Sequence, residues 1–349
     1  MSNGMSKFTK GCLITALVTF IIGLLMCGIG ALMGGFRMLD GMDIEGITGI
    51  PFRYHSGVNG GVEYGFGWDD GWDDIDWSEY KNWSSLSRSN NKVELDLTAD
   101  TLHNLSMEMG ACDLYIVETA DEKAGIEISG DTKHFRYLVK NDGSLCMVHR
   151  AGHGFWNWTH HSITPATKVT LYLPKGVELV ELDIDLGAGN MESIELRAQN
   201  ISVEVGAGEC EADGFTAKGE IDLTVGAGQI TLDSLHAGEL DMEVGAGALD
   251  IKDICVERDT DLVLGVGNAN LEGLFLGNMS LECDIGDVTL NLDDAEEDHN
   301  YEIECSLGDV RVGSNSYTSL ANEVYISNGA DSTYDIECSL GSVSFKFVR

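Results

Sequence analysis

The amino-acid sequence predicts an all-β fold, a β-solenoid of about twenty residues per coil that is preceded by one N-terminal transmembrane helix. The main observation is a strand-like phrase ending in Gly-x-Gly that returns at a nearly constant interval. Its first glycines lie 19, 20, 19 and 20 residues apart, at Gly187, Gly206, Gly226, Gly245 and Gly265. Related phrases with wider spacing contain Gly286, Gly308 and Gly341, and an early copy contains Gly110. Such a period is typical of repeat proteins whose coils pack on their neighbours.

Alternation of apolar and acidic residues predicts that each phrase is a strand with one buried face. In LDIDLGAG, Leu182, Ile184 and Leu186 alternate with Asp183 and Asp185. This period of two matches a β-strand, whose successive side chains point to opposite faces. A second apolar register follows four and nine residues after each glycine, so two strands and two turns per coil are expected.

Glycine at the corner of each coil has a physical reason, because it enters positive φ freely and lets stacked backbones approach closely. An antiparallel sandwich with a glycine-containing turn every ten residues is the alternative, although a sandwich does not require the same phase in successive units. The phrases lack the Lys and Ser or Thr of a phosphate-binding loop, and the Asp of calcium-binding nonapeptide repeats.

The charge of the chain limits its partners. The sequence has 58 acidic and 21 basic residues, a net charge of -37. Nucleic acid is therefore excluded as a partner, because its phosphate backbone requires positive neighbours. The apolar fraction of 43% is ordinary, so we expect the acidity to lie on the surface of a folded domain.

Residues 11–36 contain no charged residue and predict a transmembrane anchor, because the run is long enough to cross a bilayer as a helix. A cleaved signal peptide and a lipoprotein modified at Cys27 are the alternatives. The preceding residues 1–10 carry Lys7 and Lys10 and no acidic residue. The positive-inside rule then predicts a single-pass protein of the cell membrane, with a cytoplasmic N-terminus and an extracellular C-terminal domain.

Residues 37–91 are predicted to form a tether. Gly, Asp, Ser and Asn dominate this segment without sustained periodicity, and Trp68, Trp72 and Trp77 are interleaved with acidic residues. A flexible stalk is the favoured interpretation, and an aromatic, acidic recognition segment is the alternative.

Residues 92–349 are predicted to form the folded domain. Strands are expected in VELDLTAD, LHNLSMEMGACDLYIVE, GIEISG, FRYLVKND, SLCMVHR and KVTLYLPKG, ahead of the regular repeats. Asn141-Asp142-Gly143 is a hairpin signal. After Gly286 the wider spacing predicts inserted turns at DDAEEDHN and at residues 314–322, and SVSFKFVR is expected to be the closing strand.

This order of segments resembles the bacterial putative-adhesin family of β-strand repeat envelope domains. The resemblance rests on the strand-rich lead-in, on KVTLYLPKG, and on the repeated strand-GxG or strand-GDV units, and it covers about residues 92–349. It implies an envelope protein with a β-repeat fold and an N-terminal membrane segment. It implies no catalytic residues, and it informs the fold more than the activity.

The candidate binding residues are acidic side chains four positions before the marker glycines. They are Asp183, Asp222, Asp241, Asp261, Glu282, Glu304 and Glu337, with Ser202 in one coil. In parallel coils these residues would lie about 4.8 Å apart and form a carboxylate ladder. It would be reinforced two residues further along by Asp185, Glu204, Glu243 and Asp284. The ladder is either a solvated surface that keeps the protein soluble, or a binding site for divalent cations or a cationic peptide.

Two other groups of residues have side chains that can bind metals or react. His153, His160 and His161 lie in a Trp-rich segment at residues 153–161, and their spacing matches no metal-ligand pattern. The favoured interpretation is a hairpin tip that packs on the sheet. Three cysteines that precede their glycines by three residues, Cys283, Cys305 and Cys338, are predicted to be inward-facing free thiols. No cofactor is expected.

These observations predict a membrane-anchored, extracellular binding or scaffolding protein of the bacterial cell envelope, adhesin-like and not an enzyme, with an unknown envelope or surface ligand. One alternative is a module that captures or senses cationic peptides or divalent cations through the acidic ladder. The other is a carbohydrate-active β-helix, which would need long loops around a groove with converging carboxylates. The coils of this chain are too short to supply such loops.

Overall fold

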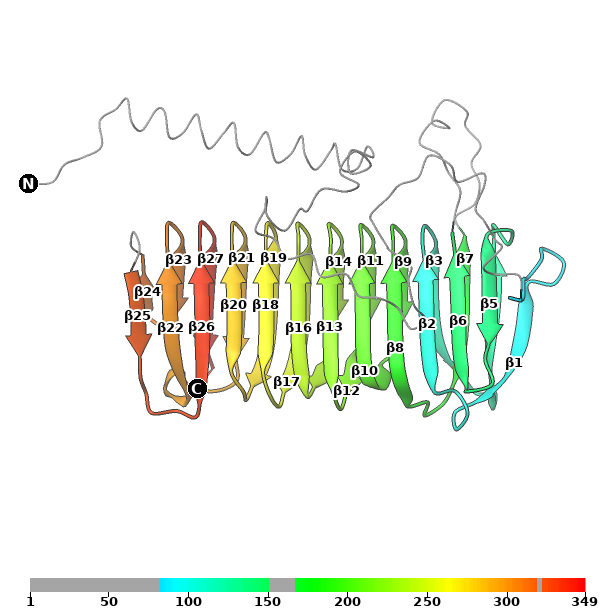
Figure 1. Ribbon diagram of the computed structural model, residues 1–349, viewed down its shortest axis with the longest axis horizontal. Coiled ribbons are helices and arrows are strands. Elements are labelled where there is room, and N and C mark those ends of the chain that lie inside the picture. Colours follow the sequence, from blue (N-terminus) through cyan, green and yellow to red (C-terminus); the bar gives the residue numbers. More distant parts are fainter. Residues whose placement is uncertain (1–81, 151–166, 319–321, 349) are drawn as a thin grey trace, which may run out of the picture. The chain divides into compact units, whose positions relative to one another are not determined.

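The computed structural model describes residues 82–150, 167–318 and 322–348, which form an all-β domain of stacked coils (Figure 1). The predicted anchor at residues 11–36, the tether up to residue 81 and the histidine segment at 153–161 lie outside the described residues. Among the residues that are described, no helix has the length and apolar character needed to span a membrane.

Strands follow one another along the described chain with one short 3-10 helix between them. The first are β1 (Lys92–Thr98), β2 (Asn104–Met109), β3 (Asp113–Thr119), β4 (Lys123–Ser129), β5 (Phe135–Val139), β6 (Ser144–His149), β7 (Lys168–Pro174), β8 (Leu179–Leu186) and β9 (Asn190–Ser193). The middle ones are β10 (Leu196–Val205), β11 (Glu209–Ala212), β12 (Phe215–Ala217), β13 (Glu220–Val225), β14 (Gln229–Leu232), β15 (Leu235–Ala237), β16 (Glu239–Val244), β17 (Ala248–Val256), β18 (Thr260–Leu264) and β19 (Asn268–Phe275). The last are β20 (Met279–Cys283), β21 (Asp287–Leu292), η4 (Glu296–Asp298), β22 (His299–Cys305), β23 (Asp309–Val312), β24 (Asn315–Tyr317), β25 (Asn322–Ile326), β26 (Ser332–Cys338) and β27 (Ser342–Phe347).

A regular coil contains three strands, not the two that the sequence predicted. In one coil β13, β14 and β15 follow each other, and each pairs in parallel with its counterparts in the coils on both sides. The third strand, β15, has only three residues, Leu235–Ala237. A segment this short is missed because it is too brief to show a period of two.

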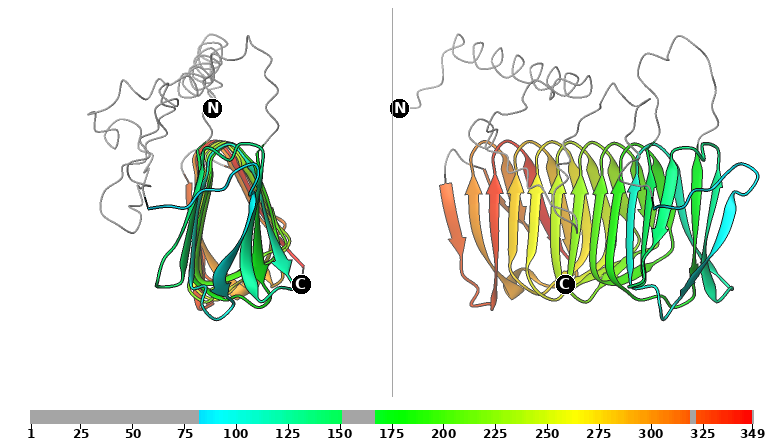
Figure 2. Two further views of the ribbon diagram at one scale, coloured as in Figure 1. Left: turned by 90° about the vertical axis from the view of Figure 1, so that its right-hand side faces the viewer. Right: turned by 45° about the vertical axis from the view of Figure 1, so that its right-hand side comes forward.

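Two long walls of strands enclose the core, as the end-on view in Figure 2 shows. The first face is built from β2, β8, β10, β13, β16, β18, β20, β26 and β22, and the second face from β3, β9, β11, β14, β17, β19, β21, β27 and β23. Inward side chains align from coil to coil, so that Val205 pairs with Leu186 and Val225. All three are at most 1% exposed, and this alignment makes the core one continuous column.

The second glycine of each corner is the one that the stacking requires. A Cβ atom added to Gly208 would overlap the backbone of Gly189 in the preceding coil. At the first glycine there is more room, since a Cβ added to Gly206 would stand 2.7 Å from the carbonyl oxygen of Gly187. Close approach of the backbones therefore selects glycine most strongly at the second position.

This difference explains an error of register in the later coils. Cys283 pairs with Leu264, so Asp284 takes the place of the first glycine and Gly286 is the second. The sequence prediction counted Gly286 as the first glycine of its corner. The predicted positions in the later coils are therefore displaced by two residues. A shift of two keeps the buried face buried, because side chains alternate with a period of two.

Both ends of the stack depart from the order of the chain. β26 lies between β20 and β22, and β27 lies between β21 and β23, so the last coil in sequence is second to last in space (Figure 1). At the other end β2 lies between β6 and β8. SVSFKFVR is therefore a strand, β27, as predicted, but it does not close the solenoid.

Antiparallel strands cover the outermost coils. β25 pairs with β22 and β24 with β23 at one end, while β5 pairs with β6 and β4 with β7 at the other. The hairpin predicted at Asn141-Asp142-Gly143 joins β5 to β6, with a φ of 80° at Gly143. Covered edges do not offer the next parallel coil a free template for pairing.

Candidate functional site

The first face carries three rows of outward side chains that run across the coils. The middle row contains Asp183, Ser202, Asp222, Asp241, Asp261, Ser280, Asp335 and Glu302 in spatial order. The corner row lies two residues closer to the Gly-x-Gly corner and contains Glu108, Asp185, Glu204, Thr224, Glu243, Val263, Glu282, Glu337 and Glu304. Carboxylates therefore dominate both rows.

The structure divides the predicted ladder between these two rows. Asp183, Asp222, Asp241 and Asp261 belong to the middle row, whereas Glu282, Glu337 and Glu304 belong to the corner row. Asp284, predicted as a reinforcing residue, lies in a corner turn. The two-residue shift of the later coils causes this division. The predicted acids share one face, but they do not form one row.

Burial and neighbouring acids raise the pKa values of five carboxyl groups on this face. Burial and the neighbouring charges of Glu204 and Glu108 raise the pKa of Asp185 to about 7. Burial, a hydrogen bond with Glu220 and the charges of adjacent aspartates raise the pKa of Asp241 to about 6. Burial and like charges also raise the pKa values of Glu204, Glu243 and Glu304. A raised carboxyl pKa means that the surroundings of the carboxyl group disfavour its ionised form.

A third row, the margin row, is farther from the corner and shows how carboxylates can be satisfied within the protein. Asn200 Nδ2 donates to Glu181 Oε1 at 3.0 Å, and Asn278 Nδ2 donates to Asp259 Oδ1 at 3.0 Å. Arg258 Nε donates to Glu239 Oε1 at 2.8 Å in the same row. The row thus places amide donors at Asn200 and Asn278 beside its acids, and Arg258 reaches it from the bend before β18, although Glu220 and Glu239 still pair directly.

The three cysteines form a column on the inner side of the first face, and the prediction that they are buried free thiols is confirmed. Cys283 pairs with Cys338, and Cys338 pairs with Cys305, so the last cysteine of the chain is the central one. They are 2%, 2% and 4% exposed, respectively. They continue the column of Leu264, two residues nearer the corner than the column of Ile184 in which they were predicted, so the inward orientation is unchanged.

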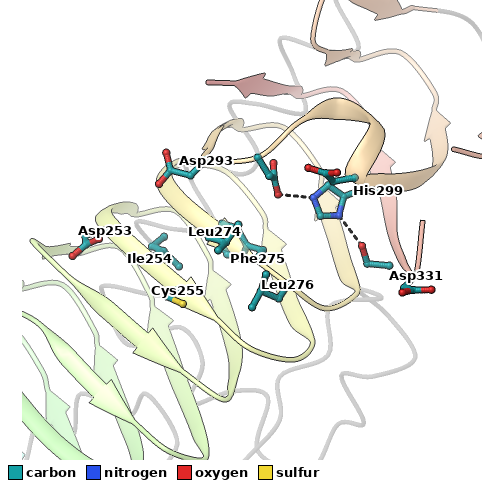
Figure 3. A pocket seen from close by; sticks show the side chains of 12 residues that line it. Asp253, Ile254, Cys255, Leu274, Phe275, Leu276, Asp293, His299 and Asp331 are labelled. Atoms are coloured by element: carbon teal, nitrogen blue, oxygen red, sulfur yellow. Dashed lines mark hydrogen bonds and ion pairs between the residues drawn. The ribbon is translucent and has the colours of Figure 1, made fainter. Parts of the chain in front are cut away.

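A surface cleft of about 680 Å³ lies near the end of the stack that contains β22. Figure 3 shows His299 among the side chains that line it, and Ser332 and Asp294 belong to the same lining. His299 Nδ1 lies 2.7 Å from Ser332 Oγ, and His299 Nε2 lies 2.6 Å from Asp294 Oδ2. The Tyr334 hydroxyl is 3.1 Å from the same Nε2 and donates to the carbonyl of Phe275 at 3.0 Å.

Serine, histidine and aspartate together have the composition of a nucleophilic triad. Here, however, the Nε2 atom that would face the nucleophile contacts Asp294 and Tyr334, and Ser332, His299 and Asp294 are 7%, 3% and 6% exposed. The network joins the inserted turn before β22 to the start of β26, so it stabilises the displaced last coil. Sequence reasoning missed it because the turn was read as an insertion, and 33 residues separate His299 from Ser332.

The described residues contain many potential metal ligands, but these are not gathered into a site. Across 82–150, 167–318 and 322–348, no group of three or more His, Cys, Asp or Glu side chains is arranged to hold a metal ion. A cation on the first face would therefore interact with rows of carboxylates and not with a closed coordination shell.

Comparisons with known proteins give distant structural likenesses and one family. No curated protein matches the chain. A putative adhesin from Bacteroides fragilis is 10% identical over 73% of this chain and 95% of its own, with a TM-score of 0.45. A putative cell adhesion protein from Clostridium sporogenes (12% identity, 73% and 98% coverage) has a TM-score of 0.26. A putative lipid binding protein from Parabacteroides distasonis (11% identity, 73% and 95% coverage) has a TM-score of 0.34.

These structural likenesses are too weak to assign a function. The family comparison is stronger, because the toastrack DUF4097 profile matches residues 80–345 of the 349-residue chain. The resemblance that the strand-Gly repeats indicated is thereby confirmed, and the protein belongs to the toastrack DUF4097 family.

Proposed function

We propose that this chain is a non-catalytic binding or scaffolding protein of the bacterial cell envelope, and that the first face captures a polycationic partner. Residues 11–36 would anchor it in the cell membrane, with the β-domain outside. The family match supports the fold of this domain, and the charge pattern of the N-terminus supports its proposed placement outside the membrane.

One observation carries the proposed partner class: carboxylates occupy the same outward position in three adjacent coils. Asp222 pairs with Asp241, and Asp241 pairs with Asp261. Two unit charges about 4–5 Å apart in water repel by roughly 1 kcal/mol, and like charges directly opposite in a sheet are destabilising. A cationic ligand that spans several coils would relieve this repulsion at each one, so many weak contacts would add up.

Binding of fluorescently labelled polylysine to the full-length protein in detergent tests this proposal. The first-face variant carries Asp222→Asn, Asp241→Asn and Asp261→Asn. The matched second-face variant carries Glu192→Gln, Glu211→Gln and Asp250→Asn, which lie in one row of the second face. It removes the same number of charges from the same domain, so it controls for net charge.

The first-face variant should bind polylysine about tenfold more weakly at low salt, since three contacts of about 0.5 kcal/mol each correspond to that factor. The polylysine affinity of the second-face variant should stay within about twofold to threefold of the wild-type affinity, which corresponds to about one contact of the same strength. Added monovalent salt should weaken wild-type binding, because exposed charges are screened. An equal loss of polylysine affinity in both variants would show that net charge alone determines binding. It would refute a specific binding site on the first face.

Localisation has its own test. Protease added to intact cells should degrade the β-domain if it lies outside the membrane. Full protection of that domain, with digestion after lysis, would contradict the extracellular placement.

A further inference from the structure

The corner between the first and second faces bears a row of outward side chains, one from the middle of each corner turn from Ala188 onwards. In spatial order this corner ridge consists of Ala188, Ala207, Ala227, Ala246, Val266, Ile285, Leu340 and Leu307. Backbone hydrogen bonds fix the order. Leu340 N donates to Asp284 O at 2.7 Å, and Leu307 N donates to Ser339 O at 2.8 Å, so each turn lies directly on the next.

The size of the ridge side chains changes along the stack. Alanine is sufficient at the first four corners, so the turn itself does not require a large side chain. The last four corners carry Val266, Ile285, Leu340 and Leu307, which are 45%, 39%, 44% and 63% exposed. Single exposed apolar residues are ordinary, but a contiguous exposed row is typical of an interaction surface.

Carboxylates flank this apolar part of the ridge. Glu282, Glu337 and Glu304 of the corner row lie on the first-face side, and exposed Asp284 lies in one of the turns. On the second-face side the exposed Asp287 follows the same turn. An anionic membrane surface would be repelled here. So would a second copy of this chain, which carries a net charge of -37.

The spacing of the ridge favours a helical occupant. Neighbouring coils lie about 4.8 Å apart, and successive turns of an α-helix rise about 5.4 Å, so each helix turn can meet one coil. Four ridge residues span three such intervals, roughly 14 Å, which is close to three helix turns. Basic side chains on either side of the helix's apolar stripe would reach the flanking acids.

We infer that the corner ridge from Val266 to Leu307, with its acidic flanks, binds an amphipathic cationic helix. The inference rests on the proposed capture of polycations by the first face. The preferred partner has an apolar stripe in addition to its positive charge, so charge alone does not give full affinity.

The test compares two probes and four forms of the full-length protein, namely the wild type, a ridge variant, a control variant and Ala246→Leu, in the same non-binding detergent. The probes are labelled polylysine and a synthetic Leu/Lys peptide with an apolar stripe at helical spacing. The ridge variant carries Leu307→Ser and Leu340→Ser. The control variant carries Leu276→Ser, a leucine that is 54% exposed and lies outside the ridge. Unchanged melting temperatures establish that both variants fold, since all three side chains are largely exposed.

The ridge variant should bind the amphipathic peptide at least tenfold more weakly than the wild type does. Its affinity for polylysine should equal that of the wild type. The control variant should bind both probes normally, and Ala246→Leu, which lengthens the ridge by one coil, should strengthen peptide binding. Equal affinity of the ridge variant and the wild type for the peptide would overturn the ridge proposal alone. Failure of the wild type to bind polylysine would instead defeat the proposed function.

Discussion

The first and second faces are built from the same coils and enclose the same core, but their outward rows differ. On the first face Asp222, Asp241 and Asp261 follow one another directly. The row of Glu192 on the second face continues with Glu211, Thr231, Asp250 and Asn270. Hydroxyl and amide side chains interrupt this row after two carboxylates, whereas the first face has interruptions at Ser202 and Ser280 but keeps three aspartates in succession between them. Stacking of parallel coils therefore does not require consecutive acids.

This difference indicates that the acids of the first face are not needed for folding. They align like charges at the strand spacing, and burial together with neighbouring acids raises the pKa values of Asp185 and Asp241. If the fold alone determined the outward residues, both faces would tolerate the same mixture of polar side chains. We interpret the first face as a surface that gives up some stability for binding.

The largest expected loss of stability comes from a charge placed in the core that the two faces share. Cys338→Asp should lower the free energy of unfolding by about 4 kcal/mol or more, because it places a charge between Cys283 and Cys305 in the interior. Glu337→Gln, one residue away on the outside, should change it by less than about 0.5 kcal/mol. Chemical denaturation measures both. A mild effect of Cys338→Asp would place this side chain outside the core.

A buried histidine should make the core sensitive to acid. His149 is 0% exposed, and burial lowers its pKa to about 4. The unfolded chain then binds a proton below its ordinary pKa of about 6.5 while the folded chain does not, so stability falls as the pH drops from about 6.5 to 4, by about 3 kcal/mol. His149→Leu should abolish that loss. An unchanged pH profile in the variant would assign the acid sensitivity to another group.

The first face should respond to pH in the opposite direction. The pKa of Asp185 is raised from 3.8 to about 7, so the folded chain binds a proton that the unfolded chain has released. Its contribution is present below about pH 4 and is lost as the pH rises towards 7; solvent screening limits it to no more than about 2 kcal/mol. Asp185→Asn should flatten this part of the stability profile. A steeper decline in the variant would contradict the assigned raised pKa.

Much of this architecture could be predicted from the sequence, because the buried residues carry a strict period. The strands, the inward cysteines and the acidic face all followed from alternation and from the glycine repeat. The spatial order could not be predicted, since nothing local indicates that β26 enters between β20 and β22. Glu282 was predicted in the wrong row because Asp284 occupies the position of the first glycine. Positions in this coil were therefore counted from Gly286, which is the second glycine.

The network around His299 marks a second limit of sequence reasoning. Its parts come from the turn before β22 and from the start of β26, and they meet only because the last coil is displaced. Sequence periodicity reports which side of a strand is buried. It does not report which coils become neighbours when the order of the chain is broken.

The most direct test of the central claim is the free energy of unfolding of the first-face variant at low salt, measured against the wild type and the second-face variant. The first-face variant should be more stable than the wild type by about 1 kcal/mol, because it removes the repulsion among Asp222, Asp241 and Asp261. Polylysine, or high monovalent salt, should close this gap by neutralising the same charges in the wild type. A first-face variant that is no more stable than the wild type at low salt would contradict the claim that this face is held in repulsion until a cationic partner binds.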